Sequence, residues 1–155
     1  MDLSDMLNSI QLSQNSNAVM ELVRLNEKTK EWGLILTPDD AKTLVVSRNK
    51  VLRDHARVEL SIGVLKELIE VFSTSPYMDQ EHYVDTLNEL QEIFYYLRNE
   101  TGDKFSDAKL IQLVNESYNG SCAGSIELLK SKTEEFAEDF RRNIALPNSL
   151  FKGDD

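Results

Sequence analysis

Hydrophobic residues recur every three or four positions through most of this chain, which is the spacing of amphipathic helices. Residues that start or stop helices separate these stretches, so the pattern predicts an all-α fold, a compact bundle of about five or six helices. The expected helices cover residues 18–32, 38–55, 58–73, 80–100, 106–118 and 125–146, and a further short helix over residues 2–12 is left open.

Short local motifs mark several helix boundaries. Thr37 precedes a proline and two aspartates, which favours a capped helix start with acidic side chains in the first turn. Gly33 is the expected left-handed stop of the preceding helix, and Asn17 is the expected cap of its start. The Ser- and Asn-rich stretch 13–17 predicts a break between the short N-terminal helix and the helix that follows. The resulting division is an N-terminal segment over residues 1–16, a single helical domain over residues 17–146, and a tail over residues 147–155.

Residues 58–73 carry two periodicities. Apolar residues alternate from Val58 to Val64 as in a strand, and from Val64 onward their spacing becomes helical. Because the chain offers no second strand to pair with this one, we expect helix throughout, with Gly63 inside it. One kinked helix over residues 38–73 is left open.

The stretch 80–100 has the most regular pattern in the chain. Its apolar side chains follow a 4-3-4-3 spacing that predicts a buried seam, formed by Tyr83, Leu87, Leu90, Phe94 and Leu97. Four acids lie on the opposite side and are named here the acidic ridge: Glu81, Asp85, Glu89 and Glu92. A solvated face is the ordinary interpretation of such a stripe, and docking of a basic partner is the functional one.

Composition narrows the classes of function. A net charge of −10 over 155 residues disfavours nucleic acid or an anionic membrane as the main partner. Residues 38–57 nevertheless carry a net charge of +2, so nucleic-acid binding through the helix at 42–57, with Lys50, Arg53 and Arg57, is kept as an alternative. No apolar run approaches the roughly 20 residues that span a bilayer. The single cysteine fits a reducing compartment, and we expect a cytoplasmic protein.

Cys122 is the strongest candidate for chemistry. It lies among glycines and small residues just before a predicted helix, where a thiol can have a lowered pKa. A Cys122-dependent enzyme would need His55 or His82 as a base, whereas the alternative is that Cys122 packs as a small apolar residue. A dimetal site needs two Glu-x-x-His motifs, and the chain offers only Asp79-x-x-His82, so we predict neither metal nor cofactor.

Four stretches of the chain resemble a known family. They are LVRLNEKTKEWGLILTPDDAKTLVVSRN at 22–49, RVELSIGVLKELI at 57–69, YVDTLNELQEIFYYLRNET at 83–101 and GSCAGSIELL at 120–129. They are similar to a family of short bacterial proteins known only as a domain of unknown function. The resemblance implies a bacterial cytoplasmic protein, and it implies no activity, substrate or catalytic residue.

The sequence therefore favours a non-enzymatic protein-interaction module that binds a protein partner, with self-association left open. Asp85, Glu89 and Glu92 of the acidic ridge are the candidate binding residues. An enzyme that uses Cys122 is the first alternative, and a nucleic-acid binder is the second.

Overall fold

The computed structural model describes residues 3–142, and for residues 4 and 7–14 it describes the backbone alone. Six helices of ten or more residues carry the fold, and no strand occurs within residues 3–142, so the predicted all-α class is confirmed. The elements are α1 (Leu3–Arg24), α2 (Asn26–Thr29), the 3-10 helix η1 (Lys30–Trp32), α3 (Pro38–Asp54), α4 (Gly63–Phe72), α5 (Tyr83–Glu100), α6 (Asp107–Asn119) and α7 (Ile126–Arg142).

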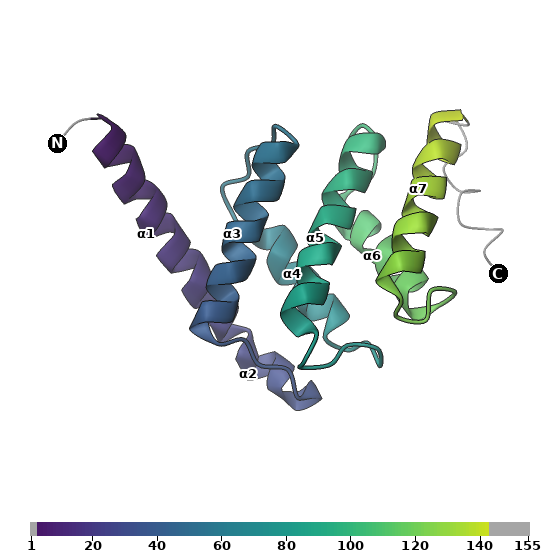
Figure 1. Cartoon of the computed structure of the whole chain (residues 1–155), viewed down its shortest axis with the longest axis horizontal. Coiled ribbons are helices and arrows are strands. Elements are labelled where there is room, and N and C mark those ends of the chain that lie inside the picture. The colour runs from purple at the N-terminus through teal and green to yellow at the C-terminus, as the bar shows by residue number, and fades with distance from the viewer. Residues whose placement is uncertain (1–2, 143–155) are drawn as a thin grey trace.

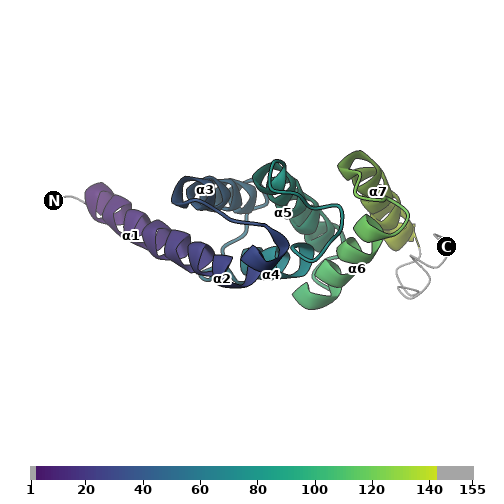
Figure 2. The ribbon, with the colours of Figure 1, turned by 90° about the horizontal axis from the view of Figure 1, so that it is seen from below.

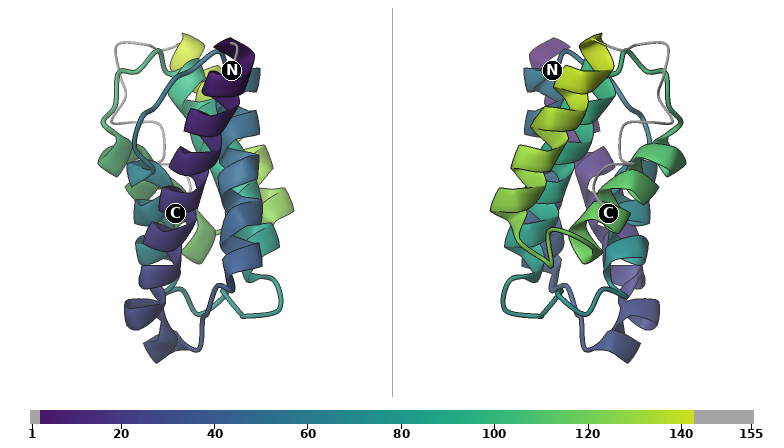
Figure 3. Two further views of the ribbon diagram at one scale, coloured as in Figure 1. Left: turned by 90° about the vertical axis from the view of Figure 1, so that its left-hand side faces the viewer. Right: turned by 90° about the vertical axis from the view of Figure 1, so that its right-hand side faces the viewer.

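The helices form two layers (Figures 1 and 2). Helices α3, α5 and α7 lie side by side in one layer and run in the same direction, while α1, α4 and α6 run the opposite way in the other. Figure 3 shows the two layers edge-on, from the two ends of the molecule. Because α5 contacts α3, α4, α6 and α7, it is the central helix of the fold.

Local capping explains the helix starts that the sequence predicts. Thr37 Oγ1 accepts a hydrogen bond from the Asp40 N–H at 3.0 Å, and Asp40 Oδ2 accepts one from the Thr37 N–H at 3.1 Å. This capping box satisfies two backbone donors at the start of α3. Ser106 Oγ accepts from the Lys109 N–H at 3.1 Å at the start of α6. Gly33 ends η1 with a φ of 75°.

The predicted seam is confirmed as the centre of the core. All five of its side chains are fully buried along α5: Tyr83, Leu87, Leu90, Phe94 and Leu97. They contact apolar residues from both layers, as the central position of α5 requires. Tyr95 is also buried, whereas its neighbour Tyr96 is half-buried at the surface.

Two sequence predictions are wrong. The break over residues 13–17 does not occur, because α1 continues from Leu3 to Arg24 and Asn17 lies inside it. Asn49 Nδ2 of α3 donates to Asn15 Oδ1 at 3.1 Å, and Ala18 and Leu22 are buried in the core. Packing against α3 therefore outweighs the weak helix propensity of Asn and Ser.

Residues 58–62 are the second correction, because they are not helical. α3 ends at Asp54, Ala56 has a φ of 54°, and the Arg57 N–H bonds to Leu52 O at 2.8 Å. Gly63 is the first residue of α4 and not an interior one. A single continuous or kinked helix over residues 38–73 is thereby excluded.

The C-terminal end of the chain is only partly described. α7 ends at Arg142 in the described range, so the predicted helix end near residue 146 and the tail over 147–155 lie outside it. No helix in the described range is both long and apolar enough to cross a membrane.

Candidate functional site

The acidic ridge contacts α7 through Glu89, and its members differ in environment. Glu81, Asp85 and Glu92 are exposed, whereas Glu89 is half-buried. Glu89 Oε2 contacts Lys130 Nζ of α7 at 2.7 Å, and this hydrogen bond raises the pKa of the Lys130 ammonium. One member of the ridge is therefore paired with α7, whereas the other three are exposed to solvent.

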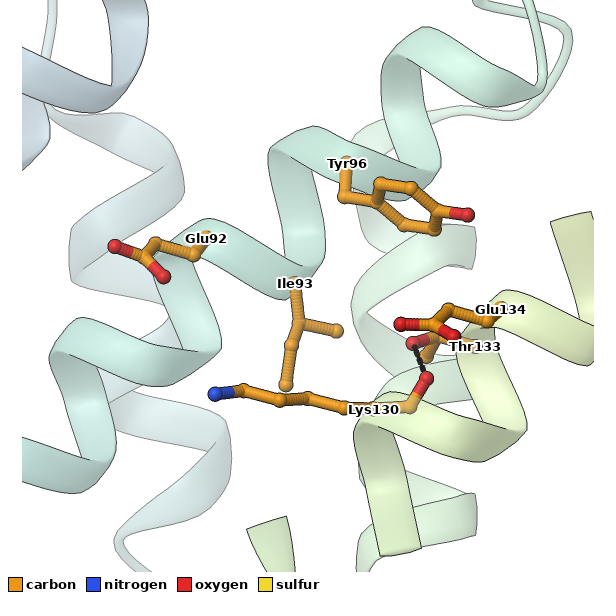
Figure 4. Close-up of a pocket in the computed structure, with 6 residues that line it drawn as sticks. All are labelled: Glu92, Ile93, Tyr96, Lys130, Thr133 and Glu134. Carbon is orange, nitrogen blue, oxygen red and sulfur yellow. Dashed lines mark hydrogen bonds between the residues drawn. The ribbon is translucent and has the colours of Figure 1, made fainter. Parts of the chain in front are cut away.

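A cavity of about 140 Å³ lies between α5 and α7 on one side of this ion pair. Figure 4 shows Ile93 and Tyr96 of α5 facing Lys130, Thr133 and Glu134 of α7 across it, while the carboxylate of Glu92, which also belongs to the lining, points away from these side chains. The aliphatic stem of Lys130 runs beneath Ile93 (Figure 4), so the cavity has an apolar floor. Thr133 Oγ1 donates to Lys130 O at 2.9 Å, which keeps its hydroxyl bonded to its own helix.

A larger cleft of about 460 Å³ contains Glu89 on the other side of the pair. Its walls combine acids and aromatic rings: Tyr77, Asp79, His82, Asp85, Thr86, Glu89, Tyr118, Gly124, Ile126 and Glu127. We name this cleft and the smaller cavity together the acidic groove.

Asp79 and His82 form a hydrogen-bonded pair in the cleft. Asp79 Oδ1 accepts from the His82 backbone N–H at 2.8 Å and lies 2.9 Å from His82 Nδ1. The side-chain hydrogen bond and the negative charge of Asp79 raise the pKa of His82. The backbone N–H of His82 is the main cause that lowers the pKa of Asp79. Asp79 therefore bonds to His82, the residue just before α5.

Tyr77 is held in place by a glycine. Gly124 has a φ of +79°, and a Cβ built on it would lie 2.5 Å from Tyr77 Cβ. The Tyr77 and Tyr118 rings meet edge to face with centroids 6.3 Å apart. The close approach of Gly124 therefore sets the position of one aromatic wall of the cleft.

The acidic groove has the chemistry of a site for cations. Its carboxylates come from the segment 79–92 and from α7, and they are Asp79, Asp85, Glu89, Glu92, Glu127 and Glu134. The lysine in its lining, Lys130, is bound to Glu89. Aromatic faces and carboxylates together suit ammonium and guanidinium groups. The sequence analysis did not predict that Glu127 and Glu134 of α7 belong to the site, because no local sequence signal indicates which helix packs beside α5.

Cys122, His82 and His55, the candidate residues of the enzyme alternative, each contact a different residue and not one another. Cys122 is buried, 1% exposed, and its Sγ lies 3.6 Å from Ser117 Oγ. His82 pairs with Asp79 in the cleft, and His55 Nδ1 lies 2.6 Å from Asn99 Nδ2 near the C-terminal end of α5. Over residues 3–142, no group of three or more His, Cys, Asp or Glu side chains could hold a metal ion.

The bases of the nucleic-acid alternative are mostly engaged within the protein. Lys50 Nζ lies 2.8 Å from Asp54 Oδ2, and Arg57 Nη2 lies 2.9 Å from Asp103 Oδ1. Arg53 is exposed.

The comparisons with known proteins identify a family. The Family of unknown function (DUF6323) matches residues 21–146, so the chain belongs to it. This match confirms the resemblance seen in the four sequence stretches and continues to residue 146. No curated protein and no solved structure matches the chain.

Proposed function

We propose that this member of a family of unknown function is a protein-interaction module whose acidic groove binds a basic segment of a partner protein. One observation carries the proposal: acidic residues from the segment 79–92 and from α7 line the same two hollows, whose walls also include apolar and aromatic side chains. If the acids of α5 were only a solvated face, there would be no reason for acidic residues of α7 to line the same hollows.

The charges support attraction of a cationic chain. Six carboxylates line the groove, and its lysine, Lys130, is already neutralised by Glu89. A concentration of one sign of charge speeds the encounter with an oppositely charged partner.

The walls support contact after that encounter. Lys and Arg side chains have long aliphatic stems, which can lie against Ile93 and Tyr96 while their charged ends meet Glu92 and Glu134. In the larger cleft, the exposed ring of Tyr77 offers an aromatic face to the same groups. Binding of this kind requires no chemical step, in keeping with the buried position of Cys122.

A pair of double charge reversals tests the proposal. The test variant is Asp85→Lys with Glu92→Lys, both exposed in the groove, and the matched control is Glu31→Lys with Glu116→Lys, both exposed elsewhere. Glu89 is left unchanged because it is bound to Lys130. The ligands are two fluorescent peptides of equal length. In the basic peptide Leu alternates with Lys or Arg, and in the acidic control peptide Glu replaces each Lys and Arg.

We expect the basic peptide to bind the wild type and the control variant, and to associate about tenfold more slowly with the test variant at low salt. The difference should shrink as salt screens the charges. Amide chemical shifts should move along α5 and α7 when the basic peptide is added. Equal association of the basic peptide with test variant and wild type at low salt would contradict the proposal, as would shifts confined to other helices.

A further inference from the structure

The segment 57–61, between α3 and α4, presents two aliphatic side chains to solvent. Val58 is 87% exposed and Leu60 is 95% exposed, the highest values among the exposed large hydrophobic side chains of the described range. Arg57 and Glu59 alternate with them and are turned inward. Single exposed aliphatic residues are common, but a pair on one segment is the pattern of a contact surface.

Contacts with the interior hold this segment in place. Arg48, which is buried on α3, donates from Nη2 to Glu59 O at 2.7 Å and to Ser61 O at 2.8 Å. The buried Tyr95 hydroxyl donates to Glu59 Oε1 at 2.6 Å. Arg57 Nη1 donates to Asn99 Oδ1 at 2.6 Å. These bonds fix the backbone so that Val58 and Leu60 point away from the protein.

Two cavities lie on the two sides of Leu60, which lines both. One, of about 590 Å³, lies between α1, α3 and the segment and contains Arg48, Arg53 and Arg57 together with the apolar Leu52. The other, of about 640 Å³, contains Glu59, Glu67 and Asp107. The lining of the first has three arginines against two acids, Glu21 and Glu59, and the charged residues of the second are all acidic.

One charged residue on each side is unengaged. Over the described residues, the side chains of Arg53 and Glu67 make neither a hydrogen bond nor an ion pair, whereas the Asp107 carboxylate is bound by Arg98. The surface around Leu60 therefore offers a free cation on one side and a free anion on the other.

We propose that two copies of this chain pair through the segment 57–61, about a two-fold axis that runs along the boundary between the two cavities. Such an axis exchanges the two sides, so Arg53 of each copy faces Glu67 of the other. Val58 and Leu60 of each copy pack against the same residues of the other, and Leu60 lies at the mouth of its partner's cavities. A surface that carries both signs of charge on opposite sides of an apolar centre is self-complementary, as a two-fold interface requires.

Sedimentation equilibrium of the full chain over a range of concentrations tests the apolar part. We expect the wild type to form a dimer and Val58→Asp with Leu60→Asp to weaken it by about a hundredfold, because each lost contact occurs twice. Circular dichroism should be unchanged, since both side chains are exposed. The matched control, Val46→Asp with Leu128→Asp, replaces two exposed aliphatic residues elsewhere and should dimerise like the wild type.

Charge reversal tests the symmetry of the pairing. Arg53→Glu alone and Glu67→Lys alone should each weaken the dimer by about tenfold or more, because like charges then face each other twice. A one-to-one mixture of the two variants should dimerise again. In that mixed dimer the new carboxylate at position 53 of one variant meets the new ammonium at position 67 of the other, and the unchanged Arg53 meets the unchanged Glu67. The double variant Arg53→Glu with Glu67→Lys should also recover the dimer.

Three outcomes would overturn the proposal. They are a wild type that stays monomeric up to about 1 mM, a dimer that survives both aspartates at 58 and 60, and a mixture of the two charge variants that remains as weak as either alone. The test does not involve the acidic groove, so its result is independent of the function proposed above.

Discussion

Gly124→Ala should be the most informative single substitution, because two separable costs meet at this residue. The first is conformational: at φ +79° an L-residue with a Cβ costs about 1–2 kcal/mol. The second is steric: the new methyl group would lie 2.5 Å from Tyr77 Cβ and 2.6 Å from Tyr77 Cγ. Overpacking of this kind typically costs about 1–3 kcal/mol. We expect a total loss of about 2–5 kcal/mol in the free energy of unfolding.

Gly102→Ala is the matched control, because Gly102 has a φ of +61° and nothing within 4 Å of the built Cβ. It should lose only the conformational part, about 1–2 kcal/mol. Urea unfolding monitored by circular dichroism gives both free energies, provided that each transition is two-state. The difference between the two variants is the steric contribution of Tyr77.

The same substitution should disturb the acidic groove. Displacement of Tyr77 moves one wall of the larger cleft, so Gly124→Ala should also weaken binding of the basic peptide, whereas Gly102→Ala should leave it unchanged. The reasoning would be refuted if Gly124→Ala cost no more stability than Gly102→Ala, because the contact with Tyr77 would then carry no penalty.

Three further outcomes are expected. Leu90→Ala should lower the free energy of unfolding by about 2–5 kcal/mol in urea titrations, since Leu90 is fully buried, and a loss below about 1 kcal/mol would contradict its core position. Thr37→Ala should cost about 1 kcal/mol in the same assay by removing the capping box of α3, and an unchanged midpoint would count against that role. Asp79→Asn should lower the raised pKa of His82 toward 6.5 in an NMR titration. The stability from this pair is full between about pH 4, above which Asp79 is ionised, and about pH 6.5. It is lost as pH rises through the raised folded-state pKa of His82 and as pH falls through the lowered one of Asp79, a trend that Asp79→Asn should abolish.

The helix boundaries that the sequence predicted correctly depend on neighbours close in the chain. Thr37 and Asp40 bond to each other's backbone N–H groups, and Ser106 bonds to the N–H of Lys109. Gly33 adopts a positive φ at a helix end. Motifs of this kind are contained within a few residues, so the sequence alone determines them. The seam of α5 follows for the same reason, because a regular apolar stripe on a long helix must face the core.

The sequence alone placed one part of the candidate site, the acidic residues of α5, and did not place the residues of α7. The acids of α5 could be placed on one side of that helix from their spacing, but the sequence does not indicate that α7 lies beside them. Lys130 and Glu89 are 41 positions apart in the chain and only 2.7 Å apart in space. Whether Glu89 is solvated or paired therefore depends on the packing of α7 against α5, which no local pattern encodes.

The sequence by itself determined that this chain is helical, where capped helices begin, and which side of α5 is buried, because hydrogen bonds and periodicity within one helix decide these features. Only the tertiary structure decided that α1 continues through a stretch of Asn and Ser, since Ala18 and Leu22 are buried in the core shared with α3. It likewise decided that residues 58–62 form a non-helical connection, because Arg48 of α3 and Tyr95 of α5 hydrogen-bond to Glu59. Long-range contacts outweigh weak local preferences, and they form only when distant parts of the chain pack together.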